Sequence, residues 1–407
     1  MIFLLKKCFF SYYYFIVLLG FTSMIGIQDW YSFLILIPIF ILFFTFRTIK
    51  FRFFDLVVLS FMFFCMVSVI WSNAPLIVGY YGLKEEIIPI LFYFIARSSG
   101  FQNNSFFENM KYPLVIAFIC AIALYFFPPA WYVNFKMKNL SADATSTVIY
   151  EHTRLSGFWG WSYFMGYSSL FFIMYQINKL LRDEKTSICN ILFVFTALIV
   201  LFFAQQRVSI VFFFLYLIIV TIYAYKKKMP NRSALKFFWL VIVIVGVVIY
   251  YLMAYCLDAD FTDYVFNRTV DLEDNVLTER FGMFSDILQV SFLGDGLGTH
   301  IHSAASFRLK VISDCDYVRI LAQYGIWGSC MLICILFDTL IKGTVILKYV
   351  LFDFLVILFL CISMTGAAPL SHTPLQPYLY WFCIGHIQSV YFYCKRIKIQ
   401  VKRCSLV

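Results

Sequence analysis

Three arginines of this 407-residue chain lie where polar segments meet apolar ones, and together they could bind an anion. Arg154 and Arg207 directly flank apolar runs, and Arg280 lies in the longest polar stretch. Guanidinium groups stay charged and pair with phosphate oxygens in a bidentate manner, so such a set can hold a pyrophosphate without a metal ion. A single arginine at a helix end is more often an interfacial residue that snorkels, but three of them favour an anion site.

Two aspartates precede an apolar stretch with helical periodicity, YVRILAQYGIWG, at the end of the same polar region. Asp314 or Asp316 would be a natural N-cap for that helix. The alternative is a catalytic carboxylate that accepts the proton of a bound hydroxyl group, which requires hydrogen-bond contact with the nucleophile. Both roles can be present, one for each residue. Arg319, one helical turn later, is a further candidate for contact with a substrate.

A glycine-rich segment, Gly294-Asp295-Gly296-Leu297-Gly298, lies between the arginine and the aspartates. Its amides, those of Gly296 and Gly298 included, could approach an anion in a tight turn, although most such segments are only turns. His300 and His302 follow and are candidates for contact with a glycan or a phosphate.

No residue pattern predicts a metal ion or another cofactor. The two histidines have no third ligand at a suitable spacing, and Cys330 and Cys334 lie in an apolar run without a second pair. Cys256 and Cys315 could both face an oxidising compartment, but nothing in the sequence supports a disulfide between them.

The elements that carry these residues are expected to be membrane helices. Hydrophobic residues make up 62% of the chain and charged residues 13%, far outside the composition of soluble proteins. Apolar runs close to the roughly 20 residues needed to cross a bilayer recur along the sequence. We therefore expect an all-α polytopic membrane protein of about twelve helices, forming a single membrane domain over residues 1–407. The expected spans cover about residues 9–27, 30–46, 53–70, 75–96, 113–127, 157–177, 188–204, an eighth from 207, a ninth to 255, 326–341, 349–368 and 378–394.

Basic residues are distributed unevenly among the connecting segments. They gather near both termini, as at Lys6, Lys7 and Lys395, and in alternate loops between. By the positive-inside rule both termini are cytoplasmic, and two loops, 128–156 and the larger 256–325 before helix 10, lie outside, in the periplasm if the cell has two membranes. The net charge of +10 is then a signal of membrane topology and not of nucleic-acid binding.

One expected span carries charged residues. Lys84, Glu85 and Glu86 lie within 75–96, and charges at bilayer depth are costly. Either the span begins later and leaves these residues at the outer interface, or they line a cavity.

The motifs follow one another in a recognisable order. They are Trp71-Ser72, Arg154-x-Ser-Gly, Gln206-Arg207, Arg280, Gly294-x-Gly-x-Gly, and Asp314-Cys-Asp-Tyr followed by Gly325-Ile-x-Gly328. This order resembles that of the O-antigen polymerase and O-antigen ligase superfamily, over most of the chain. Each motif is degenerate, so the resemblance rests on their order.

The resemblance implies glycosyl transfer at the periplasmic face of the bacterial inner membrane. The donor would be an undecaprenyl-pyrophosphate-linked oligosaccharide, and a chain-length regulator and a flippase would be partner proteins. Arg154, Arg207 and Arg280 would neutralise the departing pyrophosphate, and Asp314 or Asp316 would activate or orient the acceptor hydroxyl.

One difference from the family pattern bears on whether the chain resembles the polymerases or the ligases. The ligases carry a His-Asn pair where this chain has Asp314-Cys315, which favours a polymerase of O-antigen or capsular polysaccharide. A ligase that transfers the glycan to a lipid A-core acceptor remains the alternative, with His300 or His302 as the substitute histidine. From another class, a transporter or flippase of an amphiphilic solute would use Glu85, Glu86 and the carboxylates Asp55, Asp338 and Asp353. No internal repeat supports that class.

Overall fold

A computed structural model describes thirteen stretches of the chain, which include most of the expected spans. They are residues 51–99, 105–132, 154–157, 162–181, 188–227, 235–236, 239–240, 243, 246–247, 291–312, 315–367, 369–370 and 375–404. The expected spans 9–27 and 30–46, and most of the ninth, lie outside these residues.

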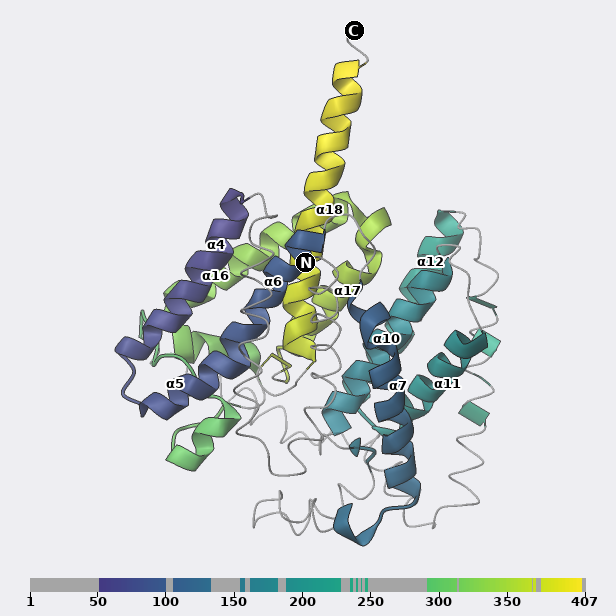
Figure 1. Ribbon diagram of the computed structural model, residues 1–407, viewed down its shortest axis with the longest axis horizontal. Helices are drawn as coiled ribbons and strands as arrows, with labels where there is room; N and C mark the ends of the chain where they lie inside the picture. The colour runs from purple at the N-terminus through teal and green to yellow at the C-terminus, as the bar shows by residue number, and fades with distance from the viewer. Residues whose placement is uncertain are drawn as a thin grey trace, which may run out of the picture. The chain divides into compact units, whose positions relative to one another are not determined.

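The apolar runs in the described residues form helices, and no strand occurs among them (Figure 1). A helix satisfies its backbone hydrogen bonds internally, which a chain in an apolar environment requires. The helices are α4 (Phe53–Val67), η3 (Ser68–Ile70), α5 (Leu76–Gly82), η4 (Leu83–Ile87), α6 (Ile88–Ser99), α7 (Ser105–Phe126), α10 (Ser162–Leu181), α11 (Ile188–Phe203), α12 (Arg207–Lys226), η7 (His302–Phe307), α16 (Asp316–Val345), α17 (Leu347–Ser363) and α18 (Gln376–Cys404).

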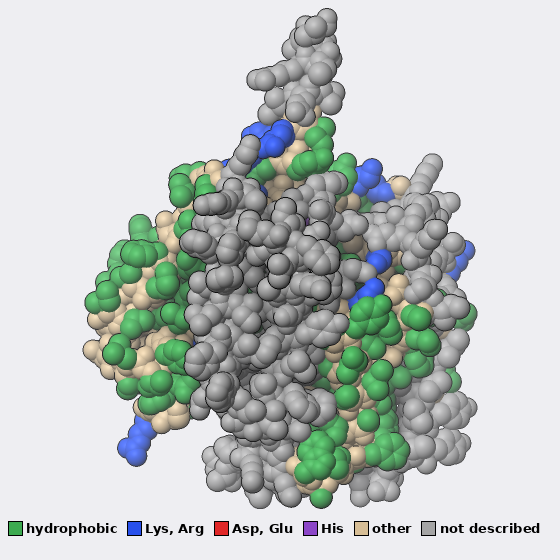
Figure 2. All heavy atoms as spheres, in the orientation of Figure 1, with side chains coloured by type: hydrophobic (Ala, Val, Ile, Leu, Met, Phe, Trp, Pro, Cys, Tyr) green, Lys and Arg blue, Asp and Glu red, His purple; other side chains and the backbone are tan. Residues whose placement is uncertain are grey.

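Three stretches of helix in the described part are long and apolar enough to cross a membrane: Phe53–Ile70, Arg207–Lys226 and Asp316–Val345. Large hydrophobic side chains point outward from them, such as Phe63, which is 64% exposed, and Phe337, which is 66% exposed. Figure 2 shows hydrophobic side chains spread over the visible surface of the described helices. Such a surface is unfavourable in water and suits contact with lipid.

Most observed helices overlap the expected spans, although several of their ends are shifted. Helix α7 begins at Ser105 instead of 113, and α18 continues to Cys404 instead of ending at 394. Helix α16 begins at Asp316 instead of 326. The full count of about twelve spans stays a prediction.

The chain divides into two compact units, and the division falls within α7 after Asn109. Unit 1 contains α4 to α6, η7 and α16 to α18, together with the glycine-rich segment. Unit 2 contains most of α7 and helices α10 to α12.

Helices α6 and α18 lie side by side in unit 1 (Figure 1). Aromatic rings fill their interface, with the centroids of Phe92 and Tyr378 4.9 Å apart. A Cβ atom at Gly385 would lie 2.2 Å from the carbonyl oxygen of Tyr93, so glycine is required for this close approach.

Helix α16 is broken at Gly325, whose φ of 62° and ψ of −166° are not helical. The break frees backbone groups that an unbroken helix would pair, and the segment 292–296 satisfies them. The amide of Asp295 donates to the carbonyl of Ala322 at 2.9 Å, and that of Gly296 donates to Gln323 at 2.8 Å. The expected start of span ten at 326 therefore corresponds to the part of α16 that follows the break.

Unit 2 packs α10 against α11 and α12. The hydroxyl group of Tyr216 on α12 donates to the carbonyl oxygen of Met174 on α10 at 2.8 Å. Gly166 allows the start of α10 to approach the turn between α11 and α12, since a Cβ atom there would lie 2.7 Å from the Cβ of Gln206.

Candidate functional site

Arg319 lies at the centre of a buried group of polar side chains in unit 1, which we call the Arg319 cluster: Glu86, Asp316, Arg319, Gln323 and Tyr324. Its side chain is 2% exposed. Its Nε and Nη2 atoms lie 2.8 and 2.7 Å from Oδ1 of Asp316. Its Nη1 donates to Oε1 of Gln323 at 2.7 Å and to the carboxylate of Glu86.

The two carboxylates of the Arg319 cluster also contact groups beyond the arginine. Oδ2 of Asp316 accepts the amide of Leu370 at 2.7 Å, and Glu86 accepts the hydroxyl group of Tyr324. The cluster thus connects η4, the first turns of α16 and the turn after α17. Two carboxylates face one guanidinium, so the buried charge is stabilised by pairing and hydrogen bonds together.

The role of Asp316 differs from the expected N-cap. Cys315 occupies the N-cap position of α16, and Asp316 is the first residue of the helix. No side-chain hydrogen bond caps this helix, and the Asp316 carboxylate turns to Arg319 one turn later instead. The N-cap interpretation of Asp316 is therefore wrong, because the buried guanidinium is a stronger partner than an orphan amide. Asp314 lies outside the described residues.

Sequence reasoning missed Glu86 as the partner of Arg319. Glu86 belongs to the π-helix η4, which joins α5 and α6 into one continuous stretch. Its side chain is 9% exposed and pairs with Arg319, while its place at the outer interface or beside a cavity stays a prediction. The available signal was the placement of Lys84-Glu85-Glu86 in an apolar run, where a charge requires a partner.

The glycine-rich segment docks onto helices of unit 1. Gly294, Gly296 and Gly298 have φ angles of 76°, 101° and 80°, which favour glycine. A Cβ atom at Gly294 would lie 2.4 Å from the carbonyl oxygen of Gln323, and one at Gly298 would lie 2.4 Å from that of Val78. The segment therefore lies against both α5 and α16, next to the Arg319 cluster.

Gly296 contacts the Trp71-Ser72 motif. A Cβ atom at Gly296 would lie 2.6 Å from the Cβ of Ser72. Its amide donates a hydrogen bond to the carbonyl oxygen of Gln323. The acceptor of this amide in the structure is therefore a protein group and not an anion.

His300 is held between two acceptors close to the glycine-rich segment. Its Nδ1 lies 2.6 Å from the carbonyl oxygen of Lys310, and its Nε2 lies 2.8 Å from Oδ2 of Asp295. His302 begins η7. No group of three metal-ligating side chains occurs among the described residues.

In unit 2, Arg154 and Arg207 lie at the same end. The amide of Leu155 donates to the carbonyl of Phe203 at 3.0 Å, which brings Arg154 to the turn from which α12 begins at Arg207. Nε of Arg154 is buried and has no hydrogen-bond partner in the described part of the chain. The Arg207 side chain is exposed. This end of unit 2 therefore offers guanidinium donors to an anion.

The remaining predicted residues are outside the described stretches. They are Arg280, Asp314 and Cys256. The structure thus brings Asp316, Arg319 and the glycine-rich segment together in one unit, and Arg154 and Arg207 in the other. No family model, curated protein or solved structure matches this chain.

Proposed function

We propose that this protein is a polytopic glycosyltransferase of the bacterial inner membrane. It joins undecaprenyl-pyrophosphate-linked repeat units of an O-antigen or a capsular polysaccharide at the periplasmic face. Both termini are cytoplasmic in this proposal, and no metal ion takes part.

The observation that carries the proposal is the convergence of motifs that are distant in sequence. Ser72 and the glycine-rich segment, with the helix that contains Gly325, meet at one end of unit 1. Arg154 and Arg207 meet at one end of unit 2. Motifs that matched a family only by their order would have no reason to contact one another, so the contacts within each unit support the proposal.

The distribution of basic residues within unit 1 supports the proposed orientation. Arg52 precedes α4, whose other end leads through η3 toward Ser72, and Arg97 lies in the last turn of α6, whose other end follows Glu86 in η4. Lys342 lies near the end of α16 opposite to Arg319. If the basic ends face the cytoplasm, the Arg319 cluster faces the periplasm.

The reaction in this proposal is a displacement at an anomeric carbon. The acceptor hydroxyl oxygen attacks that carbon, and the bond from the carbon to the pyrophosphate oxygen breaks. Undecaprenyl pyrophosphate leaves with the electron pair, and Arg154, Arg207 and Arg280 stabilise its charge. The hydroxyl proton passes to a carboxylate.

The contacts of Asp316 suggest how the two aspartates divide the work. Both oxygens of Asp316 already accept hydrogen bonds from Arg319 and Leu370, which suits a positioning residue. Asp314, two residues earlier, is then the proton acceptor that we propose.

The test is a gel of surface glycans from a deletion strain complemented with wild type, Arg280→Ala or Asp314→Asn at equal membrane expression. Arg308→Gln is the matched control, because Arg308 is an exposed arginine of the same polar region. A polymerase predicts that the two variants reduce the ladder to a single repeat unit on its anchor, while the control keeps it.

Other outcomes identify the alternative functions. Loss of all attached glycan, with long lipid-linked chains accumulating, would mean a ligase. An unchanged ladder in the deletion strain would contradict both activities and favour the transporter.

A further inference from the structure

A pocket of about 490 Å³ opens in unit 1 at the end opposite to the Arg319 cluster, where α4 begins. We call it the Arg52 pocket, and its lining includes Arg52, Phe53, Cys334, Lys342, Phe392 and the carboxylate residue Asp338, which pairs with Lys342. The volume is within the usual range of sites for small ligands, about 300–1,000 Å³.

Three cationic side chains surround the ring of Phe392. The guanidinium carbon of Arg52 lies 3.7 Å from the ring centroid, that of Arg97 lies 5.4 Å away, and Nζ of Lys342 lies 5.1 Å away. The uncharged Phe392 ring attracts each of the three cations through its π-electrons, but it cannot neutralise their charges.

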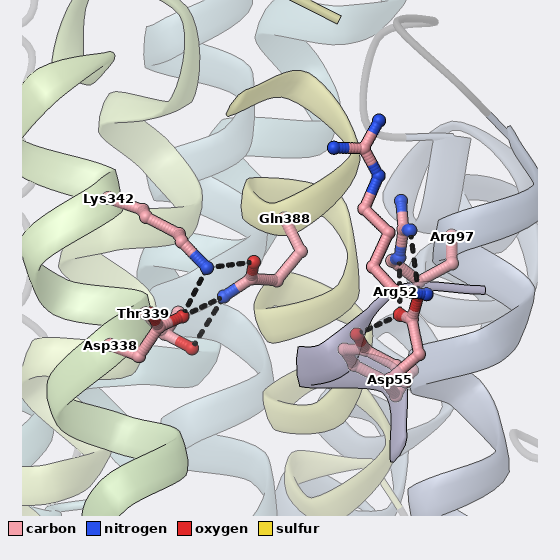
Figure 3. Close-up of polar contacts among 8 residues, drawn as sticks. Arg52, Asp55, Arg97, Asp338, Thr339, Lys342 and Gln388 are labelled. Atoms are coloured by element: carbon pink, nitrogen blue, oxygen red, sulfur yellow. Dashed lines mark hydrogen bonds and ion pairs between the residues drawn. The ribbon is translucent and has the colours of Figure 1, made fainter. Parts of the chain in front are cut away.

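Two of these cations already have carboxylate partners. Arg97 binds Asp55 with Nε at 2.8 Å and Nη2 at 3.0 Å. Lys342 donates to Asp338 at 2.6 Å and to Gln388 at 3.0 Å. Figure 3 shows the two networks, that of Lys342, Asp338 and Gln388 and that of Arg97 and Asp55, on opposite sides of the helix that carries Gln388.

Arg52 differs from the other two. Its backbone amide donates to Asp55, but its guanidinium has no hydrogen-bond acceptor among the described residues. Figure 3 shows it pointing past the Arg97–Asp55 pair, with no contact drawn to it. Burial lowers the pKa of this guanidinium from its usual value, and the nearby Arg97 and Arg396 lower it further, while Asp55 acts in the opposite direction.

We infer that the Arg52 pocket binds an anionic phospholipid of the cytoplasmic leaflet. The phosphate group is bound by the Arg52 guanidinium, which can pair with two of its oxygens. The acyl chains follow the apolar wall and the neighbouring outward side chains, of which Phe53 is 82% exposed and Leu56 is 53% exposed.

Lipid fits this site better than a free anion. Most of the lining is hydrophobic, and a free phosphate would leave that surface unused. Basic pockets between helices on the cytoplasmic side of membrane proteins are suited to anionic headgroups. The inference rests on the membrane orientation proposed above but does not depend on glycosyl transfer, so the two can fail separately.

The test is native mass spectrometry of the detergent-solubilised full chain titrated with phosphatidylglycerol, phosphatidylcholine or inorganic phosphate. We expect preferential retention of phosphatidylglycerol by wild type and a roughly fivefold loss in Arg52→Gln, as for removal of one basic residue near a headgroup. Lys348→Gln, which removes an exposed lysine of α17, should leave retention unchanged. Equal retention of phosphatidylcholine, wild-type retention by Arg52→Gln, or full competition by inorganic phosphate would overturn the inference.

A second measurement uses the unaltered chain, in case Arg52→Gln does not fold. Cys334 lines the pocket, and Cys330 lies one turn away on the same helix, outside the lining; both are exposed. Phosphatidylglycerol should slow modification of Cys334 by a small thiol reagent, as resolved by peptide mass, without slowing that of Cys330. Equal protection of both thiols, or protection of neither, contradicts the site.

Discussion

Arg319 and Glu86 form a buried ion pair although 233 positions separate them in the sequence. Through this pair the π-helix η4 is bound to the first turns of α16, and Asp316 and Gln323 complete the contacts of the guanidinium. The glycine-rich segment packs beside the same turns. The geometry of the candidate site in unit 1 therefore depends on one arginine.

Arg319→Gln is expected to destabilise the protein strongly. The substitution leaves the carboxylates of Asp316 and Glu86 buried without a cation, and loss of one partner from a buried pair typically costs about 3–5 kcal/mol. Thermal unfolding of the purified variant in detergent measures the effect. Adding Glu86→Gln should recover part of the loss, because one uncompensated charge disappears. Unfolding at the wild-type temperature would show that the pair is not formed.

Gly298→Ala should disturb the docking of the glycine-rich segment. Gly298 has a φ of 80°, a conformation that destabilises a residue with a side chain by about 1–3 kcal/mol. The added Cβ atom would also lie 2.4 Å from the carbonyl oxygen of Val78. The matched control is Gly246→Ala, where a Cβ atom meets nothing within 4 Å and the helix should gain slightly. Comparison of their unfolding temperatures checks this prediction, and equal temperatures for the two variants would argue against the observed docking.

Arg207→Gln is expected to shorten the glycan ladder without loss of folded protein. Arg207 is exposed at the start of α12, so its removal leaves no buried partner. Loss of one donor to a developing negative charge typically lowers turnover by about 10²–10³-fold. Lys226→Gln removes an exposed charge at the other end of the same helix and should keep the full ladder. If both variants give the same ladder, Arg207 has no part in the reaction.

The proposed orientation predicts that two reporter fusions at opposite sides of the membrane are both active. A green fluorescent protein fused after Val407 should be fluorescent, because it folds in the cytoplasm. An alkaline phosphatase fused after Arg308 should be active, because it requires the periplasm. The reverse pattern in both reporters would invert the topology and would remove the Arg52 pocket from the cytoplasmic leaflet.

The positions of most described helices were predictable from local sequence, whereas the break inside α16 and the π-helix η4 were not predicted. Apolar length located α4, α11 and α17 closely, and the glycine at 325 falls where the expected span ten was to start. These features depend on residues close in the chain, because helix hydrogen bonds and the apolar length of a span are local properties. The same holds for Arg154 and Arg207, whose motifs border apolar runs.

Partner choice was decided only by the tertiary structure. The sequence alone indicated that Glu86, Asp55 and Asp353 would need partners inside an apolar domain. It did not identify Arg319, Arg97 and His386 as those partners, because each pair depends on which helix faces lie together. Composition and span length thus determined the class of protein. The packing of distant helices determined which charges are paired, as in Arg319–Glu86, and left the Arg52 guanidinium without a hydrogen-bond acceptor among the described residues.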